Sequence, residues 1–186
     1  SIVQAIYVYA ASFHGKKLLA LGGNSGNPIF DWFIGRELNP RIGEFDIKTF
    51  NELRPGLILW ALLDISCVCH QYTKFGWVSD SIVLVTLFHV WYIVDSLINE
   101  STILTQMDIT TDGFGFMLSV GDLAWLPFTY CLQARFLAFH PIHLGWLGVL
   151  AILAVQFTGY YIFRVANLEK NEFRHGRNPK GTYAMR

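Results

Sequence analysis

The sequence predicts an all-α protein, a polytopic bundle of transmembrane helices, and three observations indicate this class. Of the 186 residues, 53% are hydrophobic and only 15% are charged, and the mean hydropathy is +0.36. A soluble domain carries about 25% charged residues, so this chain has too few charges for an ordinary water-exposed surface. Four stretches have close to the ~20 mostly apolar residues that a helix needs to cross a bilayer.

The predicted spans are nearly free of charge, and three of them hold one carboxylate each. Residues 144–163 carry no charge, and the other three complete spans are residues 55–73 with Asp64, 81–99 with Asp95 and 114–134 with Asp122. Residues 1–13 resemble the end of a fifth span. We therefore predict four complete spans and one partial span, and interpret residues 1–186 as an internal fragment of one transmembrane domain.

The connections between the spans predict which side of the membrane each one faces. Residues 14–54, 100–113 and 164–186 fall on one side, and together they hold twelve of the 14 Lys and Arg residues. The opposite side has only Lys74, with Arg135 near the end of a span. Because segments rich in Lys and Arg stay in the cytosol, these three connections are predicted to be cytosolic.

Several functional classes are disfavoured by composition. Fourteen basic and fourteen acidic residues cancel, which argues against a nucleic-acid partner that depends on a basic surface. The three cysteines lie in apolar stretches and the six histidines show no metal-ligand spacing, so neither disulfides nor a metal are predicted. No Gly-x-Gly-x-x-Gly or Walker pattern occurs, so a soluble type of dinucleotide fold is not expected.

An ionisable residue in a membrane helix normally faces the bundle interior or a wet cavity. Asp64, Asp95 and Asp122 are such residues, and the alternative for each is a purely structural bond to a neighbouring helix. Asp95 follows Tyr92 and His89 at intervals of three, which places the three on one helical face. A Tyr hydroxyl held by a carboxylate could donate a proton to a buried substrate, although an aromatic residue at this spacing often only packs.

Two polar segments flank the spans. The sequence MDITTDGFGF at residues 107–116 contains Asp108 and Asp112 just ahead of a span. Asp112 could be a helix cap, whereas Asp108 is less easily explained in that way. In the tail, four polar or basic residues recur at intervals of three and four, namely Asn167, Lys170, Arg174 and Arg177. If the helix of the last span continues into the tail, they form one basic stripe, which suits a ligand with several phosphates. Ordinary cytosolic flanking charge, or binding to anionic lipid head groups, is the alternative.

The segment GNPIFDWFIGRELNPR at residues 26–41 resembles the signature of the sterol reductase family. That family includes the Δ14-, Δ7- and Δ24(28)-sterol reductases and the lamin B receptor. Phe30 departs mildly, because Tyr or His is more usual there. The match continues at residues 45–56, 107–116, 121–128 and 159–167, so it covers nearly the whole chain. The sequences GREL (residues 35–38) and MDITTDGFGF look most like the Δ14 branch, especially its fungal members.

The resemblance implies a multi-pass enzyme of the endoplasmic reticulum membrane, embedded in the lipid bilayer, with a sterol substrate and NADPH as cofactor. The implied reaction reduces the 14,15 double bond of a Δ8,14 sterol to a Δ8 sterol in ergosterol biosynthesis. Lys170 and Arg174 match a Lys and an Arg of the family's cofactor site, whose larger C-terminal part this fragment lacks. Open alternatives are a Δ7- or Δ24(28)-sterol reductase and a lamin B receptor-like nuclear membrane scaffold. A transporter is a third alternative, but no repeated or broken-helix pattern supports it.

The chemistry of the implied reaction assigns roles to the candidate residues. An unactivated alkene does not accept hydride, so protonation at carbon 15 must come first and leave an allylic cation at carbon 14. Tyr92 is the predicted proton donor and Asp95 is predicted to orient it. Asp108 or Asp112 is predicted to stabilise the positive charge, while Lys170 and Arg174 bind cofactor phosphate.

The predicted topology can be tested at an N-glycosylation pattern, Asn99-Glu100-Ser101. Because we place this tripeptide on the cytosolic face, we expect Asn99 to stay unmodified in cells. The measurement is the gel mobility of the protein before and after endoglycosidase treatment. A shift in mobility that depends on Asn99 would place this loop in the lumen and reverse the orientation.

Overall fold

The computed structural model describes residues 1–177, and these residues are mostly helical. Three helices have the length and hydropathy to cross a membrane, namely Ile47–Phe75, Asp80–Ile98 and Gly145–Arg174. They coincide with three of the predicted spans, at residues 55–73, 81–99 and 144–163, except that residues 99 and 144 lie just outside the helices. The helical class and these long apolar helices are therefore confirmed.

The first long helix joins α3 (Ile47–Leu53) to α4 (Pro55–Phe75), with Arg54 between them. Pro55 is tolerated there because the first residue of a helix needs no N–H for an intrahelical bond. The second is α5 (Asp80–Ile98) and the third is α11 (Gly145–Arg174). With 30 residues, α11 is about 45 Å long and exceeds a hydrocarbon core of about 30 Å.

The predicted span at residues 114–134 is helical but interrupted. It consists of α8 (Phe116–Val120), a π-helical turn η1 (Gly121–Trp125), α9 (Leu126–Tyr130) and, extending beyond it, α10 (Leu132–Phe139). Pro127 supplies a physical reason for the break, since it has no N–H to donate within the helix and its ring pushes away the carbonyl one turn earlier. Gly56 of α4 fits against this turn, because a Cβ there would collide with the Asp122 carbonyl.

Residues 14–54, which the sequence predicts to be a polar connection, contain regular secondary structure. After α1 (Ile2–Ala11), the chain forms α2 (Pro28–Ile34) and a small antiparallel hairpin of β1 (Arg41–Ile42) and β2 (Phe45–Asp46), which departs from the all-α prediction. The side chain of Asn27 caps α2. The Ser25 hydroxyl and backbone N–H donate to Asp31 Oδ1, at 2.7 and 2.8 Å, and hold the pKa of Asp31 below its ordinary value.

Two segments far apart in the sequence, residues 35–38 and 107–116, pack against each other. The Phe114 N–H donates to the Glu37 carbonyl at 3.0 Å. Gly35 has φ +102°, and a Cβ at this position would collide with the backbone of Gly113 and Gly115. Only glycine allows the two backbones to approach this closely in this conformation.

A fully buried lysine ties the same region together. The Nζ atom of Lys48, whose side chain is 0% exposed, donates to three backbone carbonyls. These belong to Leu38 at 3.2 Å, Ile109 at 3.0 Å and Asp112 at 2.5 Å. Because each N–H of the ammonium group has an acceptor, the buried charge is stabilised without a carboxylate in direct contact.

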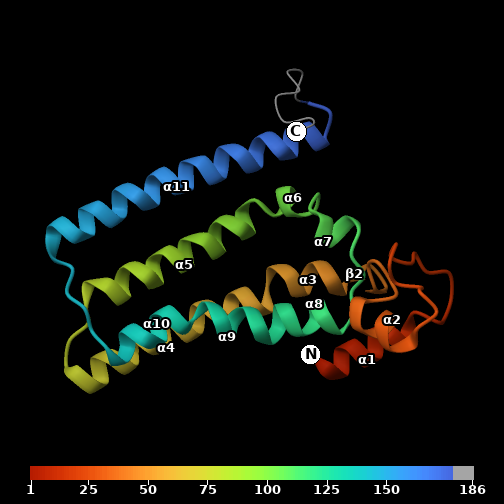
Figure 1. The fold of residues 1–186 in the computed structure, drawn as a ribbon, viewed down its shortest axis with the longest axis horizontal. Coiled ribbons are helices and arrows are strands. Elements are labelled where there is room, and N and C mark those ends of the chain that lie inside the picture. The colour runs from red at the N-terminus through yellow and green to blue at the C-terminus, as the bar shows by residue number, and fades with distance from the viewer. Residues whose placement is uncertain (178–186) are drawn as a thin grey trace.

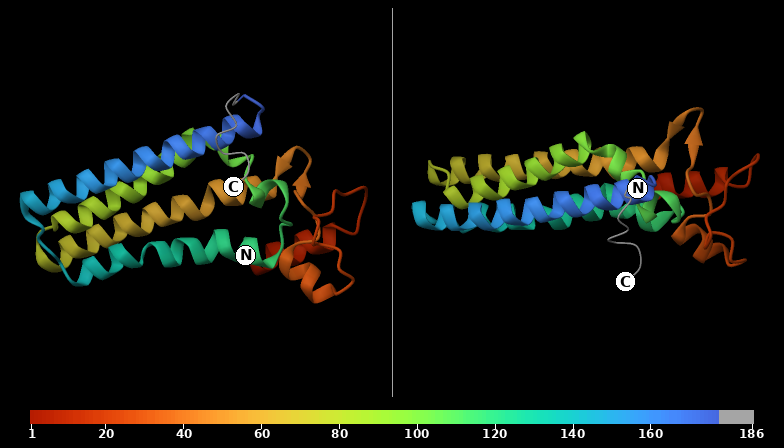
Figure 2. Two further views of the ribbon diagram at one scale, coloured as in Figure 1. Left: turned by 45° about the horizontal axis from the view of Figure 1, so that its top comes forward. Right: turned by 90° about the horizontal axis from the view of Figure 1, so that it is seen from above.

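Four helical stretches run side by side, in the order α11, α5, α4 and α8–α10 (Figure 2). Helix α4 is central and contacts α5, α9 and α10, whereas α11 packs mainly along α5 and α6 and has no buried residue. The short connections lie at one end, and α2, the hairpin, α6 (Glu100–Ile103) and α7 (Met107–Thr110) lie at the other (Figure 1). The three connections predicted to share one face therefore gather at one end, for the residues described; Lys180 and Arg186 of the predicted tail lie outside them.

Candidate active site

A polar cavity of about 260 Å³ is lined in part by residues of α6 and α7, the helices that lie at the end of the bundle where these connections gather (Figure 1). Its wall combines side chains from α3, α5, α7, η1 and α11. Three residues predicted from the sequence, Tyr92, Asp95 and Asp108, line it together although they come from two separate segments. The charged residues of its wall are Glu52, Asp95, Asp108, Asp122 and Arg164.

Asp95 is the most strongly bonded acid of the cavity. Its side chain is buried and accepts a hydrogen bond from the Tyr160 hydroxyl at 2.9 Å and another from the Asn99 amide at 3.1 Å. The Arg164 guanidinium forms an ion pair with its other oxygen. Within residues 1–177, no hydrogen bond joins Asp95 to the Tyr92 hydroxyl, so the structure provides no direct contact for the predicted orienting role.

Sequence reasoning missed Tyr160 and Arg164 as members of the site. Arg164 was assigned to the basic tail because it follows the last apolar run. The available signal was the spacing of four between the two residues, which places them on one face of a helix. Nothing in the local sequence shows that this face meets Asp95 of another helix.

His89 has a different partner from the one that the helical face predicts. Its Nδ1 atom lies 2.6 Å from Oδ2 of Asp64, so the pair joins α5 to α4. Asp64 is fully buried. The structural alternative raised for Asp64, a bond to a neighbouring helix, is therefore what the structure shows for that residue.

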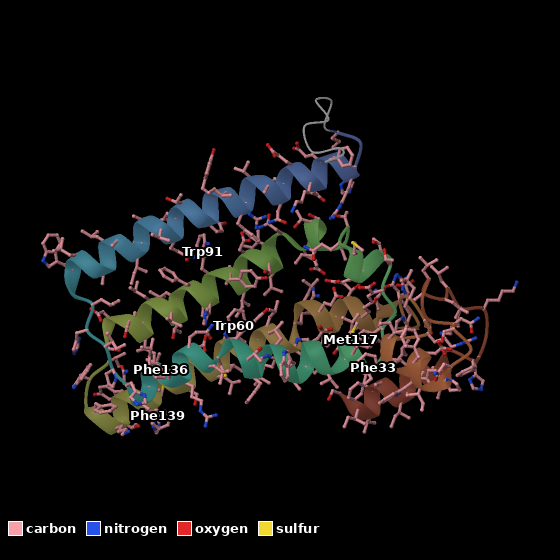
Figure 3. The ribbon with its side chains drawn as sticks, viewed as in Figure 1. Phe33, Trp60, Trp91, Met117, Phe136 and Phe139 are labelled. Carbon is pink, nitrogen blue, oxygen red and sulfur yellow. The ribbon has the colours of Figure 1, made fainter. Side chains whose placement is uncertain are left out.

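A second hollow, which we call the aromatic groove, has a volume of about 470 Å³ and adjoins the same face of α5. It is lined by Trp60, Phe88, His89, Tyr92, Tyr130, Gln133 and Gln156. In Figure 3, Trp60 lies between α4 and α5, while Trp91 lies between α5 and α11. Tyr92 lines both hollows and packs against Trp60 and Phe163, with ring centroids 5.9 and 6.4 Å apart.

The remaining acids of the polar cavity have few donors. Within the described part of the chain, Oε1 of Glu52 and Oδ2 of Asp122 are buried oxygens without a hydrogen-bond partner. Glu52 was not predicted, because it lies in a connection that the sequence analysis treated as polar loop. With Asp95 balanced by Arg164, the cavity retains unpaired acidic groups that can hold protons or stabilise positive charge.

The loop predicted to carry two functional acids separates them. Asp108 lies in the first turn of α7 and lines the polar cavity. Asp112 is not among the lining residues, and its backbone carbonyl is bound by Lys48. Of these two acids, Asp108 therefore belongs to the wall of the polar cavity and Asp112 does not.

The predicted basic stripe is helical up to Arg174, where α11 ends, so Arg177 lies beyond the helix. Asn167 lines the polar cavity, and Lys170 and Arg174 follow it along α11. The Arg174 guanidinium donates to the Thr105 hydroxyl at 3.2 Å. Within residues 1–177, no group of three His, Cys, Asp or Glu side chains is arranged to hold a metal ion.

The fold and the site define a helical protein with spans of membrane length and an acidic internal cavity bordered by a tyrosine. The chain belongs to the Ergosterol biosynthesis ERG4/ERG24 family, whose sequence profile matches residues 1–185. This finding confirms the resemblance to the sterol reductases.

The relatives of the chain include three fungal proteins with the same description. It is 64% identical to the Delta(14)-sterol reductase erg24 of Schizosaccharomyces pombe over 96% of this chain and 42% of the relative. It is 55% identical to the Delta(14)-sterol reductase ERG24 of Saccharomyces cerevisiae over 95% of this chain and 43% of that protein. It is 56% identical to the Delta(14)-sterol reductase of Ascobolus immersus over 94% of this chain and 42% of that protein. The chain thus spans less than half the length of these relatives.

The ion pair between Asp95 and Arg164 should be essential for stability. Arg164→Met leaves a buried carboxylate without its cation, and we expect the full-length protein to lose about 3 kcal/mol of unfolding free energy. Unfolding in detergent measures this loss, with Arg135→Met, at an exposed arginine, as the matched control. The double variant Asp95→Asn/Arg164→Met should regain part of the loss. Equal stability of Arg164→Met and the control would contradict the assignment.

Proposed function

We propose that the full-length protein is a Δ14-sterol reductase, which reduces a Δ8,14 sterol to a Δ8 sterol with NADPH in ergosterol biosynthesis. The observation that carries this proposal is the 48–64% identity to fungal Delta(14)-sterol reductases over nearly the whole chain. The Δ7- and Δ24(28)-reductase alternatives and the lamin B receptor-like scaffold have no comparable support among the relatives named above.

The proposed setting is the endoplasmic reticulum membrane, with residues 1–186 as part of one multi-pass domain. We propose that residues 116–139 cross the bilayer in addition to the three long helices, because they run alongside α4 for its length (Figure 2). Helix α1 would be the end of a further crossing. The gathering of the polar connections at one end supports this arrangement.

In this proposal the substrate lies in the aromatic groove and the reductant acts from the polar cavity. Tyr92 borders both, so its hydroxyl can donate a proton to a ring carbon of a sterol in the groove. The cation formed on the substrate would be stabilised by Asp108, together with the unpaired acids Glu52 and Asp122. Asp95 would act on the site through Arg164 and Tyr160.

NADPH supplies the hydride in this reaction. Lys170 and Arg174 would hold its phosphate groups, since guanidinium and ammonium groups are the usual partners of phosphate. Their position beyond Asn167 on α11, at the same end as the polar cavity, fits this role. The remaining contacts of the cofactor would come from parts of the protein outside this chain.

Tyr92→Phe tests the proton donor. Because general acid catalysis contributes about 10²–10⁴-fold, we expect the variant to lose turnover by about this factor while it keeps sterol binding. The assay is reduction of a Δ8,14 sterol by microsomes containing the full-length protein, followed by gas chromatography. Tyr161→Phe, at an exposed tyrosine of α11, is the matched control. Full turnover of Tyr92→Phe would remove the assignment, and absence of Δ14 reduction by the unaltered protein would refute the proposed function.

Neutralising the basic end of α11 tests the cofactor role. We expect Lys170→Gln/Arg174→Gln to raise the KM for NADPH by about 10- to 100-fold, because each of the two phosphate contacts weakens by about 1 kcal/mol when a neutral amide replaces the charged donor. The KM for the sterol should change little. Lys16→Gln, at an exposed lysine of a different segment, serves as the control. An unchanged KM for NADPH in the double variant would indicate ordinary flanking charge.

A further inference from the structure

The aromatic groove contains polar groups that the reduction itself does not use. Four of its lining residues are Trp60, Phe88, Tyr92 and Tyr130, which suit a flat apolar ring system. The other three are His89, Gln133 and Gln156. They come from α5, α10 and α11, and all lie within stretches predicted to cross the membrane.

These polar groups are costly where they lie. Gln133 and Gln156 both line the groove, the first exposed and the second half-buried in the structure. At membrane depth no water compensates an unmade hydrogen bond, so polar side chains there normally serve a partner or a ligand. Three such groups converging on one aromatic hollow indicate a ligand that is mostly apolar and carries a small polar group.

The pair of His89 and Asp64 indicates which polar group the ligand carries. Asp64 is fully buried and bonds Nδ1 of His89 at 2.6 Å, and a carboxylate can only accept. Nδ1 therefore carries the hydrogen, which fixes the ring orientation and leaves Nε2 as the free position. A hydroxyl group can donate to Nε2 of a neutral imidazole or accept from Nε2 of an imidazolium, so it matches either state of the ring.

The tilted contact of the His89 ring with Trp60 supports a fixed imidazole. The ring of Trp60 lies 4.5 Å from that of His89 and 5.9 Å from that of Tyr92, measured between ring centroids. Because both rings contact Trp60 and all three side chains line the groove, an extended rigid ring lipid lying over Trp60 reaches both His89 and Tyr92.

We propose that His89, held in place by Asp64, binds the hydroxyl group of a ring lipid in the aromatic groove and selects sterols that carry a free 3-hydroxyl. The inference rests on the proposed function for the identity of the lipid, and adds the recognition of its polar end. Asp64 is a positioning residue in this proposal, because it acts through His89. Gln133 and Gln156 border the same position and supply further donors and acceptors.

Equilibrium binding tests the proposal without requiring turnover. Full-length protein in lipid nanodiscs is titrated with a radiolabelled Δ8,14 sterol and, separately, with its 3-deoxy analogue. We expect the unaltered protein to bind the hydroxylated sterol about tenfold more tightly than the analogue, which is the effect of one hydrogen bond to a fixed imidazole. His89→Phe should abolish this preference by weakening the hydroxylated sterol alone, and should leave the Kd of the analogue within about twofold.

Further variants separate recognition from packing. His89→Gln keeps a hydrogen-bonding group and should retain part of the preference, while Asp64→Asn should reduce it. His70→Phe, at an exposed histidine of α4 that stacks on Phe139, is the matched control and should change neither Kd. Because binding is measured directly, a protein that fails to reduce the Δ14 bond but still shows the preference would count against the proposed function alone.

Two results would overturn the inference. If His89→Phe weakens both sterols equally, His89 only shapes the groove. If it changes neither Kd but lowers the unfolding midpoint, the imidazole serves another part of the full-length protein.

Discussion

The hydrogen-bonded cluster around Asp95 is the interaction on which the arrangement of the site depends. Within the described chain, helix α11 has no buried residue and packs mainly along α5 and α6, so apolar burial contributes little to its position. Tyr160 and Arg164 of α11 instead bind Asp95 of α5. Because a buried carboxylate is costly without its cation, this cluster fixes the rotation of α11 about its own axis.

That rotation brings the functional groups of α11 to the polar cavity. Phe163, Arg164 and Asn167 form part of its wall, and Lys170 and Arg174 continue along the same helix beyond it. The opposite wall depends on a second constraint. Lys48 and the close approach of Gly35 to residues 113–115 hold the loop that contains Asp108 against α3. A site assembled from two fixed walls keeps its acids in place before any ligand binds, which is what electrostatic stabilisation requires.

The sequence was sufficient for the features that depend on composition and local periodicity. Low charge and long apolar runs predicted the helices at residues 55–73, 81–99 and 144–163, and the rarity of acids within spans predicted Asp95 as a residue of an internal site. Tyr92, three residues before Asp95 on the same helical face, lines the same cavity, and its role as proton donor stays a prediction. The motifs at residues 26–41 and 107–116 predicted the family, which the match to residues 1–185 confirms.

Features that depend on contacts between distant segments were not accessible in this way. The pairs His89–Asp64 and Arg164–Asp95 each join residues of different helices, and no periodicity within one helix specifies its partner. Glu52 and Lys48 lie in what the sequence presents as a polar connection, yet one lines the cavity and the other is fully buried. The interruption at residues 121–125 was missed because mean hydropathy takes no account of the missing N–H of Pro127.

Among the described residues with a proposed role in the reaction, Tyr92 is the one that lines both the polar cavity and the aromatic groove. A reaction that adds a proton and a hydride to an apolar ring needs the acid at the boundary between lipid and a charged reductant. The phenol of Tyr92 has an aromatic body that packs against Trp60 and Phe163 and a polar tip, and the residue is half-exposed, so it can serve both sides without a buried permanent charge.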